Sequence, residues 1–168
     1  MNMKRIHKGQ RGLTIIELLV VIILTGLITT AITTTFFQVF NMNIRTTNHM
    51  SAISQVQQAG KLVSEDILEA QVLDDSPAGG EFLVLGWNST PSREVIYTLE
   101  DGELWREETI GGGAPTTTRV AEYIDSEQTS CVWSSGVLTF TVTATVGAGT
   151  WGEESETRIY RVQPRPGT

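Results

Sequence analysis

The stretch that decides the fold is Gly12-Leu13-Thr14-Ile15-Ile16-Glu17, followed directly by an apolar run from Leu18 to Phe40. Residues 13–40 are 28 residues with one charge, that of Glu17, and no proline. About 20 apolar residues are enough to cross the ~30 Å hydrocarbon core of a bilayer as a helix. Residues 13–40 are therefore predicted to form a transmembrane helix.

The charges that flank this run are unequal. Four cations stand before it, namely Lys4, Arg5, Lys8 and Arg11. After it the first cation is Arg45. This asymmetry predicts an N-terminus in the cytoplasm and an extracytoplasmic C-terminal part. A cleaved secretory signal has the same polarity, but its apolar core is only 7 to 15 residues long.

The motif Gly-Leu-Thr-x-x-Glu at 12–17, between a basic leader and a long apolar helix, resembles the N-terminus of type IV prepilins. That family includes type IV pilins, type II secretion pseudopilins and the pilins of DNA-uptake machines. The resemblance implies that residues 1–12 are a leader peptide, that a prepilin peptidase cuts between Gly12 and Leu13, and that Leu13 is then N-methylated. It also implies that Glu17 pairs with the N-terminal amine of a neighbouring subunit during assembly.

Two positions depart from the common pattern of that family. Leu13 replaces the more frequent phenylalanine, and Thr34 stands where major pilins often have a proline. The second departure favours a minor subunit. Gly26 falls where many members carry a glycine in the helix.

Elementary electrostatics supports a special role for Glu17. A carboxylate in the middle of a bilayer costs roughly 3 kcal/mol on insertion scales, so intramembrane ionisable groups usually have partners. After cleavage Glu17 would lie one turn from a cationic terminus, where the helix dipole also favours an anion. The alternative is a simple membrane anchor whose glutamate lies at the level of the lipid headgroups.

The net charge of −7 conceals an acidic exterior. Residues 41–168 hold 8 Lys and Arg against 18 Asp and Glu, a balance of −10. Because nucleic-acid binding depends on Lys and Arg at the phosphates, no nucleic-acid partner is expected. Cys131 is the one cysteine. It is predicted to be a buried, small apolar residue, with an intermolecular or reactive role as the alternative.

Residues 41–73 are predicted to continue the same helix, from Leu13 to about Leu73, as an amphipathic extension. Apolar or small residues recur at helical spacing and place one stripe along the helix. The stripe consists of Ile53, Val56, Gly60, Val63, Ile67 and Ala70. The charged residues Glu65, Asp66 and Glu69 are expected mainly on the other faces. Gly60 is expected to allow close approach of a strand, with a hinge as the alternative.

Residues 74–168 are predicted to form a small β-rich domain. Asp74 to Gly80 reads as a turn, and its two aspartates raise the alternative of a calcium site. Asp101-Gly102 predicts a type I′ hairpin turn. The strands are expected at residues 81–87, 93–99, 104–107, 117–124, 131–133, 137–146 and 157–162.

The segment Tyr97 to Arg106 resembles the minor pseudopilins of the J class and the related W-type minor pilins. Searching the rest of the chain for chemistry indicates no catalytic residues, no metal site and no cofactor. The four tryptophans, at 87, 105, 133 and 151, can anchor interfaces, but at least two are expected in the core.

The sequence thus predicts an α+β fold, a long N-terminal helix packed on a small antiparallel β-domain in a pilin-like lollipop. The resemblance implies a minor pilin or pseudopilin, not an enzyme, that initiates or joins a filament at the cytoplasmic membrane. Its partners would be other pilin subunits, the prepilin peptidase and the membrane. The alternative is a single-span surface receptor with an extracytoplasmic binding domain.

Overall fold

The computed structural model describes residues 12, 14–77 and 81–164. In these residues one helix is followed by eight strands, in the order α1 (Ile15–Glu69), β1 (Val72–Asp74), β2 (Leu83–Trp87), β3 (Arg93–Glu100), β4 (Glu103–Ile110), β5 (Thr116–Ala121), β6 (Ser130–Ser134), β7 (Val137–Val146) and β8 (Glu154–Val162). The protein is therefore α+β, as the sequence predicts. The chain divides into two units, Met1–Met42 and Asn43–Thr168.

The first unit contains the apolar part of α1. Its described side chains from Ile15 to Met42 are all exposed. Within the described residues, α1 is the one helix that is long and apolar enough to cross a membrane, with a mean hydropathy of 2.6 over its most apolar window. Five threonine hydroxyls return hydrogen bonds to carbonyls one turn earlier, such as Thr25 to Val21 O at 2.7 Å and Thr30 to Gly26 O at 2.8 Å. Their polar groups are thus satisfied within the helix.

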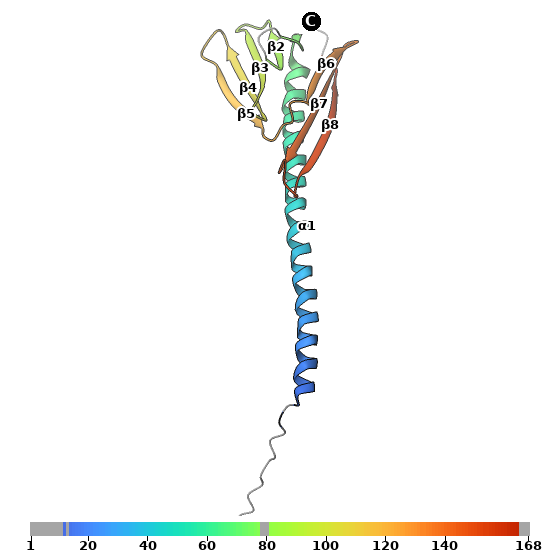
Figure 1. The fold of residues 1–168 in the computed structure, drawn as a ribbon. Coiled ribbons are helices and arrows are strands. Elements are labelled where there is room, and N and C mark those ends of the chain that lie inside the picture. The colour runs from blue at the N-terminus through green and yellow to red at the C-terminus, as the bar shows by residue number, and fades with distance from the viewer. Residues whose placement is uncertain (1–11, 13, 78–80, 165–168) are drawn as a thin grey trace, which may run out of the picture. The chain divides into compact units, whose positions relative to one another are not determined.

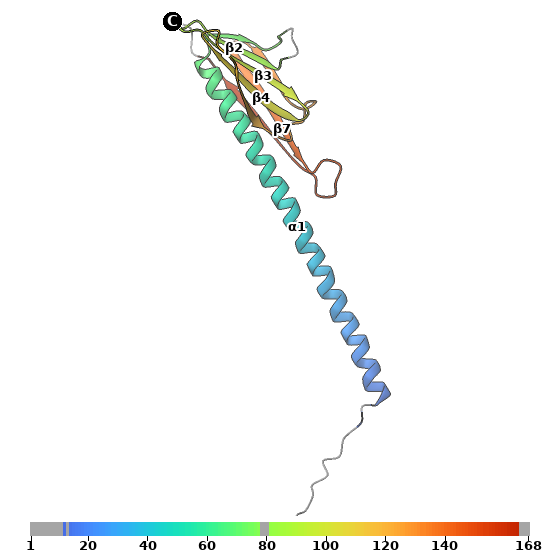
Figure 2. The same cartoon turned by 90° about the vertical axis from the view of Figure 1, so that its left-hand side faces the viewer.

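The second unit contains two antiparallel sheets that pack with the C-terminal part of α1 (Figures 1 and 2). One sheet has the order β1-β2-β3-β4-β5 and the other the order β6-β7-β8, so within each sheet every strand pairs with the strands next to it in the chain. Asp101 and Gly102 join β3 to β4 with φ values of 50° and 77°. Positive φ at both central residues is the geometry of a type I′ turn, which confirms the predicted hairpin.

The core of this unit lies between the helix and the inner faces of both sheets. Val56, Val63 and Ile67 on α1 are fully buried, as are Tyr97 on β3 and Phe140 on β7. Phe82, just before β2, meets Phe140 edge to face, with ring centroids 6.0 Å apart. Each buried aliphatic or aromatic side chain contributes about 1.5–3 kcal/mol, so this shared core holds the helix against both sheets.

Gly60 allows the close approach of β8 that the sequence indicates. A Cβ built on Gly60 would overlap the ring of Tyr160 on β8. The Tyr160 hydroxyl donates to Val56 O at 3.1 Å, which fixes the ring over the helix backbone. Gly60 itself is buried within α1.

The helix ends earlier than predicted. It stops at Glu69, whereas the sequence pattern suggests an end near Leu73. Leu73 lies instead in β1, where it pairs with Leu85 of β2. The backbone groups of Gln71 and of β1 are satisfied by β2, and this pairing with a distant strand overrides the local helical pattern.

Candidate functional site

The N-terminus of α1 is capped by Thr14 and Glu17, whose side chains bond to each other's backbone amides. Thr14 Oγ1 accepts a hydrogen bond from the Glu17 amide at 3.2 Å. Glu17 Oε2 accepts from the Thr14 amide and from the Thr14 hydroxyl, each at 3.2 Å. This is a capping box, in which a threonine and a glutamate three residues later satisfy two free amides of the first turn. The Glu17 carboxylate is therefore held at the positive end of the helix dipole.

The residues predicted for cleavage and methylation lie just before this cap. Gly12 is exposed. Leu13, the predicted methylation site, lies outside the described residues. Processing at Gly12 and Leu13 and pairing of Glu17 with another subunit therefore remain predictions. Sequence reasoning missed the role of Thr14, although the pattern Thr-x-x-Glu is itself the signature of a capping box.

One face of the apolar helix carries glycine and threonine. A groove of about 770 Å³ runs along it, lined at its centre by Thr25, Gly26 and Thr29 and at its ends by Val21 and Phe37. A Cβ built on Gly26 would meet nothing within 4 Å. Small residues on a helix in lipid let a second helix approach closely, so this face is suited to helix packing.

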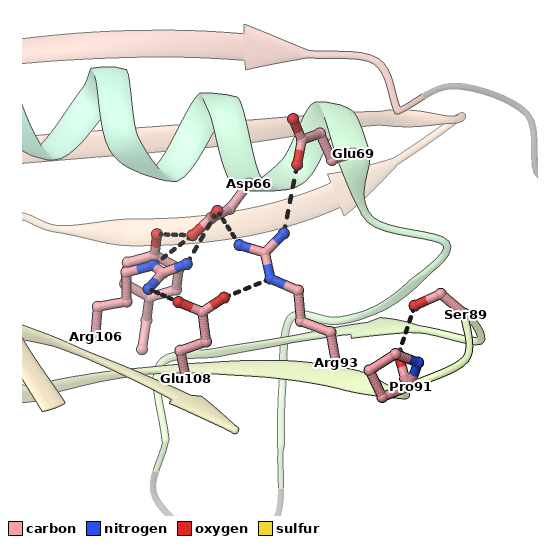
Figure 3. A network of polar contacts seen from close by, with 8 residues as sticks. Asp66, Glu69, Ser89, Pro91, Arg93, Arg106 and Glu108 are labelled. Atoms are coloured by element: carbon pink, nitrogen blue, oxygen red, sulfur yellow. Dashed lines mark hydrogen bonds and ion pairs between the residues drawn. The ribbon is translucent and has the colours of Figure 1, made fainter. Parts of the chain in front are cut away.

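A buried ionic network lies in the second unit, around Asp66 of α1 (Figure 3). The Asp66 carboxylate is buried and accepts from Tyr97 Oη at 2.6 Å and from Arg106 Nε at 2.7 Å. Arg93 Nη2 approaches the same carboxylate at 3.4 Å. Glu108 joins both arginines, at 2.6 Å to Arg93 Nε and 2.9 Å to Arg106 Nη1. These hydrogen-bonded ion pairs thus connect α1 to the β3–β4 hairpin.

This network corrects the expectation that Asp66 lies on a solvated face. Asp66 follows Ala52 and Ala59 at intervals of seven residues, and both alanines are buried. The seven-residue spacing is the signal that could have placed Asp66 on the buried face. It is tolerated there because Arg93 and Arg106 reach it from β3 and β4.

The electrostatics of the network favours its charged form. The pKa of Glu108 is held below its ordinary value, first by the hydrogen bond from Arg106 and then by that from Arg93, against the opposing effect of burial. Burial alone would lower the pKa of Arg106, but hydrogen bonds to Asp66 and Glu108 outweigh it and raise that pKa. Burial, followed by the hydrogen bond to Asp66, raises the pKa of Tyr97. These groups do not change charge near neutral pH.

The remaining candidates have structural environments. Asp74 accepts from the Ser76 amide at 3.0 Å and Asp75 from the Trp133 amide at 2.7 Å, so both carboxylates stabilise backbone. Among the described residues, no group of three or more His, Cys, Asp or Glu side chains is placed to hold a metal ion. Cys131 is half-buried against the core, and burial raises the pKa of its thiol to about 12.

The tryptophans differ from the expectation that at least two lie in the core. Trp87 packs against the core but is half-buried, and Trp105 is half-buried as well. Trp133 and Trp151 are exposed. The fully buried aromatic positions are occupied by Tyr97 and Phe140 instead.

Comparison with known families matches one part of the chain. Residues 7–33 match the model of the prokaryotic N-terminal methylation motif. The match includes Gly12, Thr14 and Glu17 and the apolar helix as far as residue 33, and it supports a type IV pilin-like family. Searches of curated proteins and of solved structures found no match.

Proposed function

We propose that this protein is a minor pilin or pseudopilin, a structural subunit that initiates or joins a type IV pilus-like or type II secretion filament. The observation that carries this proposal is the methylation motif at residues 7–33, placed at the start of a long apolar helix. The α+β fold, with a helix packed on antiparallel sheets, agrees with such a subunit.

Processing would convert the chain from a membrane precursor into an assembly subunit. A prepilin peptidase would remove residues 1–12 between Gly12 and Leu13, and the new amine of Leu13 would be methylated. The four Lys and Arg residues before the span and the scarcity of Lys and Arg just after it favour a cytoplasmic N-terminus and an extracytoplasmic domain. The protein would reside in the cytoplasmic membrane and enter a filament from there.

Assembly would use the polar end and the small-residue face of the helix. In lipid, helices associate by close packing and by polar pairs rather than by hydrophobic driving force. Glu17 would accept a charged hydrogen bond from the N-terminal amine of a neighbouring subunit. This amine is a stronger donor than the amide and hydroxyl of Thr14, which bond to Glu17 within its own chain. The face around Gly26 would allow the neighbouring helix to approach.

The layout of the β3–β4 hairpin favours a minor subunit of the J class or the W type. That assignment depends on the segment from Tyr97 to Arg106, in which the end of β3 and the start of β4 are joined by the type I′ turn at Asp101 and Gly102. Secretion, adhesion and DNA uptake all use filaments of this kind, and the acidic exterior favours secretion over DNA uptake.

Mass spectrometry of the N-terminus tests the processing step. We expect a mature chain that begins at methylated Leu13. A Gly12→Val variant should keep its leader, because a branched side chain crowds the scissile bond. Gly9→Val is the matched control, since it makes the same change within the leader and should be cleaved normally. A wild-type chain that retains Met1 would contradict the proposal and favour a simple anchor or receptor.

Cross-linking to partner pilins tests the role of Glu17. Glu17→Ala makes the span more apolar, so it should insert at least as well as wild type but fail to assemble. Thr14→Val removes the capping hydroxyl and keeps the carboxylate, which separates the two roles of Glu17. Assembly should survive Thr14→Val. If Glu17→Ala assembles normally, intersubunit pairing is not the function of Glu17.

A further inference from the structure

The loop between β7 and β8, residues 147–153, packs on α1 immediately beyond the apolar run. Asn48 Nδ2 donates to Gly152 O at 2.7 Å. Gly152 is buried, and a Cβ built on it would approach Ile44 to 3.0 Å. The loop therefore contacts the helix at Ile44 and Asn48, and a side chain in place of Gly152 would require Ile44 to move by a few tenths of an ångström.

The loop has its own internal bonds, which hold its tip in one conformation. The Thr150 amide and hydroxyl both bond to Gly147 O, at 3.0 and 2.6 Å. The Gly149 amide donates to Glu153 Oε2 at 2.7 Å. Between these bonds stands Trp151, whose backbone carbonyl accepts from Arg45 Nη2 at 3.4 Å. Trp151 is 55% exposed, although these hydrogen bonds hold the backbone of the loop on both sides of it.

Chain length places this loop close to the bilayer. Ile44 follows Phe40, the last residue of the predicted span, by four residues. Four residues cover about 6 Å as helix and no more than about 14 Å when fully extended. The headgroup layer on each side of the hydrocarbon core is itself roughly 5–8 Å thick. Residues 40–44 are helical in α1, so the shorter distance applies, and a loop fixed to Ile44 and Asn48 lies within or next to the headgroup layer.

We propose that the β7–β8 loop is a membrane-interface anchor and that Trp151 inserts its indole into the lipid headgroup layer. Tryptophan is enriched at this depth because its ring is largely apolar while its N–H needs a polar partner. The anchor would hold the folded unit against the membrane until the subunit is drawn into a filament. This inference rests on the membrane anchoring that is part of the proposed function.

The charges around Trp151 indicate whether the loop would bind lipid through headgroup charge or through its apolar indole. Arg45 is the one cation of the contact, and Glu153 and Glu154 oppose it. A local balance of −1 gives no attraction to anionic lipids, which are bound by clusters of Lys and Arg. The contact therefore depends on the apolar indole, and it should form on zwitterionic bilayers and be insensitive to salt.

Tryptophan quenching in vesicles tests this inference on the full chain. The protein is reconstituted in phosphatidylcholine vesicles with or without lipids brominated near the headgroup end of the acyl chains. We expect bromine to quench part of the wild-type emission, and this quenching to be lost in Trp151→Ser. Trp133→Ser is the matched control, because Trp133 is also exposed but lies beside the C-terminal end of α1, near Ala70 and Gln71. That variant should retain the quenching.

The outcomes separate this inference from the proposed function. Quenching that persists in Trp151→Ser, or is absent from wild-type protein that floats with the vesicles, overturns the anchor and leaves the pilin proposal intact. A chain that does not float with vesicles overturns both. Unchanged near-ultraviolet circular dichroism in Trp151→Ser would show that lost quenching is not lost folding. Quenching that disappears in high salt would refute the charge argument and with it the proposed mode of insertion.

Discussion

Arg106 is the residue on which the buried network around Asp66 most depends. It bonds to Asp66 through Nε at 2.7 Å and Nη2 at 3.3 Å, and only 11% of its side chain is exposed. Arg106→Met should lower the free energy of unfolding of residues 43–168 by about 3 kcal/mol, because it leaves a buried carboxylate short of its main partner. Urea unfolding measures the change.

A surface ion pair provides the comparison for this variant. Lys61 and Glu65 lie one turn apart on α1 at 3.9 Å, and both are largely exposed. Lys61→Met should change the free energy of unfolding by less than about 0.5 kcal/mol, since exposed pairs contribute little. Equal effects of the two variants would mean that the Asp66 network does not stabilise the unit.

Glu108 makes the stability of the unit dependent on acid. Its pKa in the folded state lies below the ordinary value of 4.5, chiefly because Arg106 donates to it. A depressed pKa stabilises the folded state at neutral pH, and this contribution is lost as the pH falls from about 4.5 through the folded-state pKa. Glu108→Gln should therefore be less stable at pH 7 and lose less stability on acidification. Thermal unfolding between pH 7 and pH 3 checks this.

At the scale of elements, the contact between α1 and β8 depends on one missing side chain. Gly60→Ala should destabilise the unit by about 1–3 kcal/mol, because its Cβ overlaps the Tyr160 ring and the strand must move. This loss would exceed the gain of up to about 1 kcal/mol that alanine brings to a helix interior. The measurement is again the free energy of unfolding.

Gly86 on β2 is the matched control for Gly60. A Cβ there would lie 3.5 Å from Val72, an ordinary contact, so Gly86→Ala should be neutral or slightly stabilising. A Gly60→Ala variant as stable as wild type would show that the Tyr160 ring can turn aside. The close approach of β8 would then not require glycine.

The elements that could be predicted are those whose signals are local. The apolar run, the stripe from Ile53 to Ala70 and the Asp101-Gly102 turn each depend on residues close together in the sequence, and all appear in the structure, although Ile53 is half-buried rather than buried. β1 and the position of Asp66 could not be obtained in this way. β1 exists because Leu73 pairs with Leu85, and Asp66 is buried because Arg106, forty residues later, meets it. Both features depend on partners far away in the sequence, which the periodicity of a local segment does not reveal.

For the candidate site at the N-terminus of α1, the sequence indicates which residue is special, but not the side chain that it bonds to within its own chain. Glu17 is conspicuous in the sequence as a carboxylate in an apolar run, whereas its hydrogen bonds to Thr14 appear only in the structure. Leu13 lies outside the described residues, so the proposed processing depends on the motif match.

At the scale of the whole molecule, charge determines which partners are excluded. Residues 43–168 carry −10, with eight cations among 18 acids. A truncated chain beginning at Asn43 should fold cooperatively, because it keeps both sheets and the buried face of α1. It should show no binding to double-stranded DNA at about 50 mM salt, where phosphate contacts are favoured.

A gel-shift assay tests the DNA prediction. Arg161 is the most exposed candidate contact on β8, on the opposite face from the half-buried Arg158. Binding that weakens with salt and disappears in Arg161→Ala would contradict the prediction. DNA uptake would then be favoured over secretion.

The order of strands in the two sheets also has a consequence for export. Because the strands within each sheet pair only with strands next to them in the chain, loop closure costs little entropy and no strand waits for a distant one. In the proposed orientation, a chain that crosses the membrane from N-terminus to C-terminus would complete β1–β5 before β6–β8 has emerged. Each sheet can thus close its backbone bonds during translocation, which shortens the time that an unpaired edge is open to aggregation.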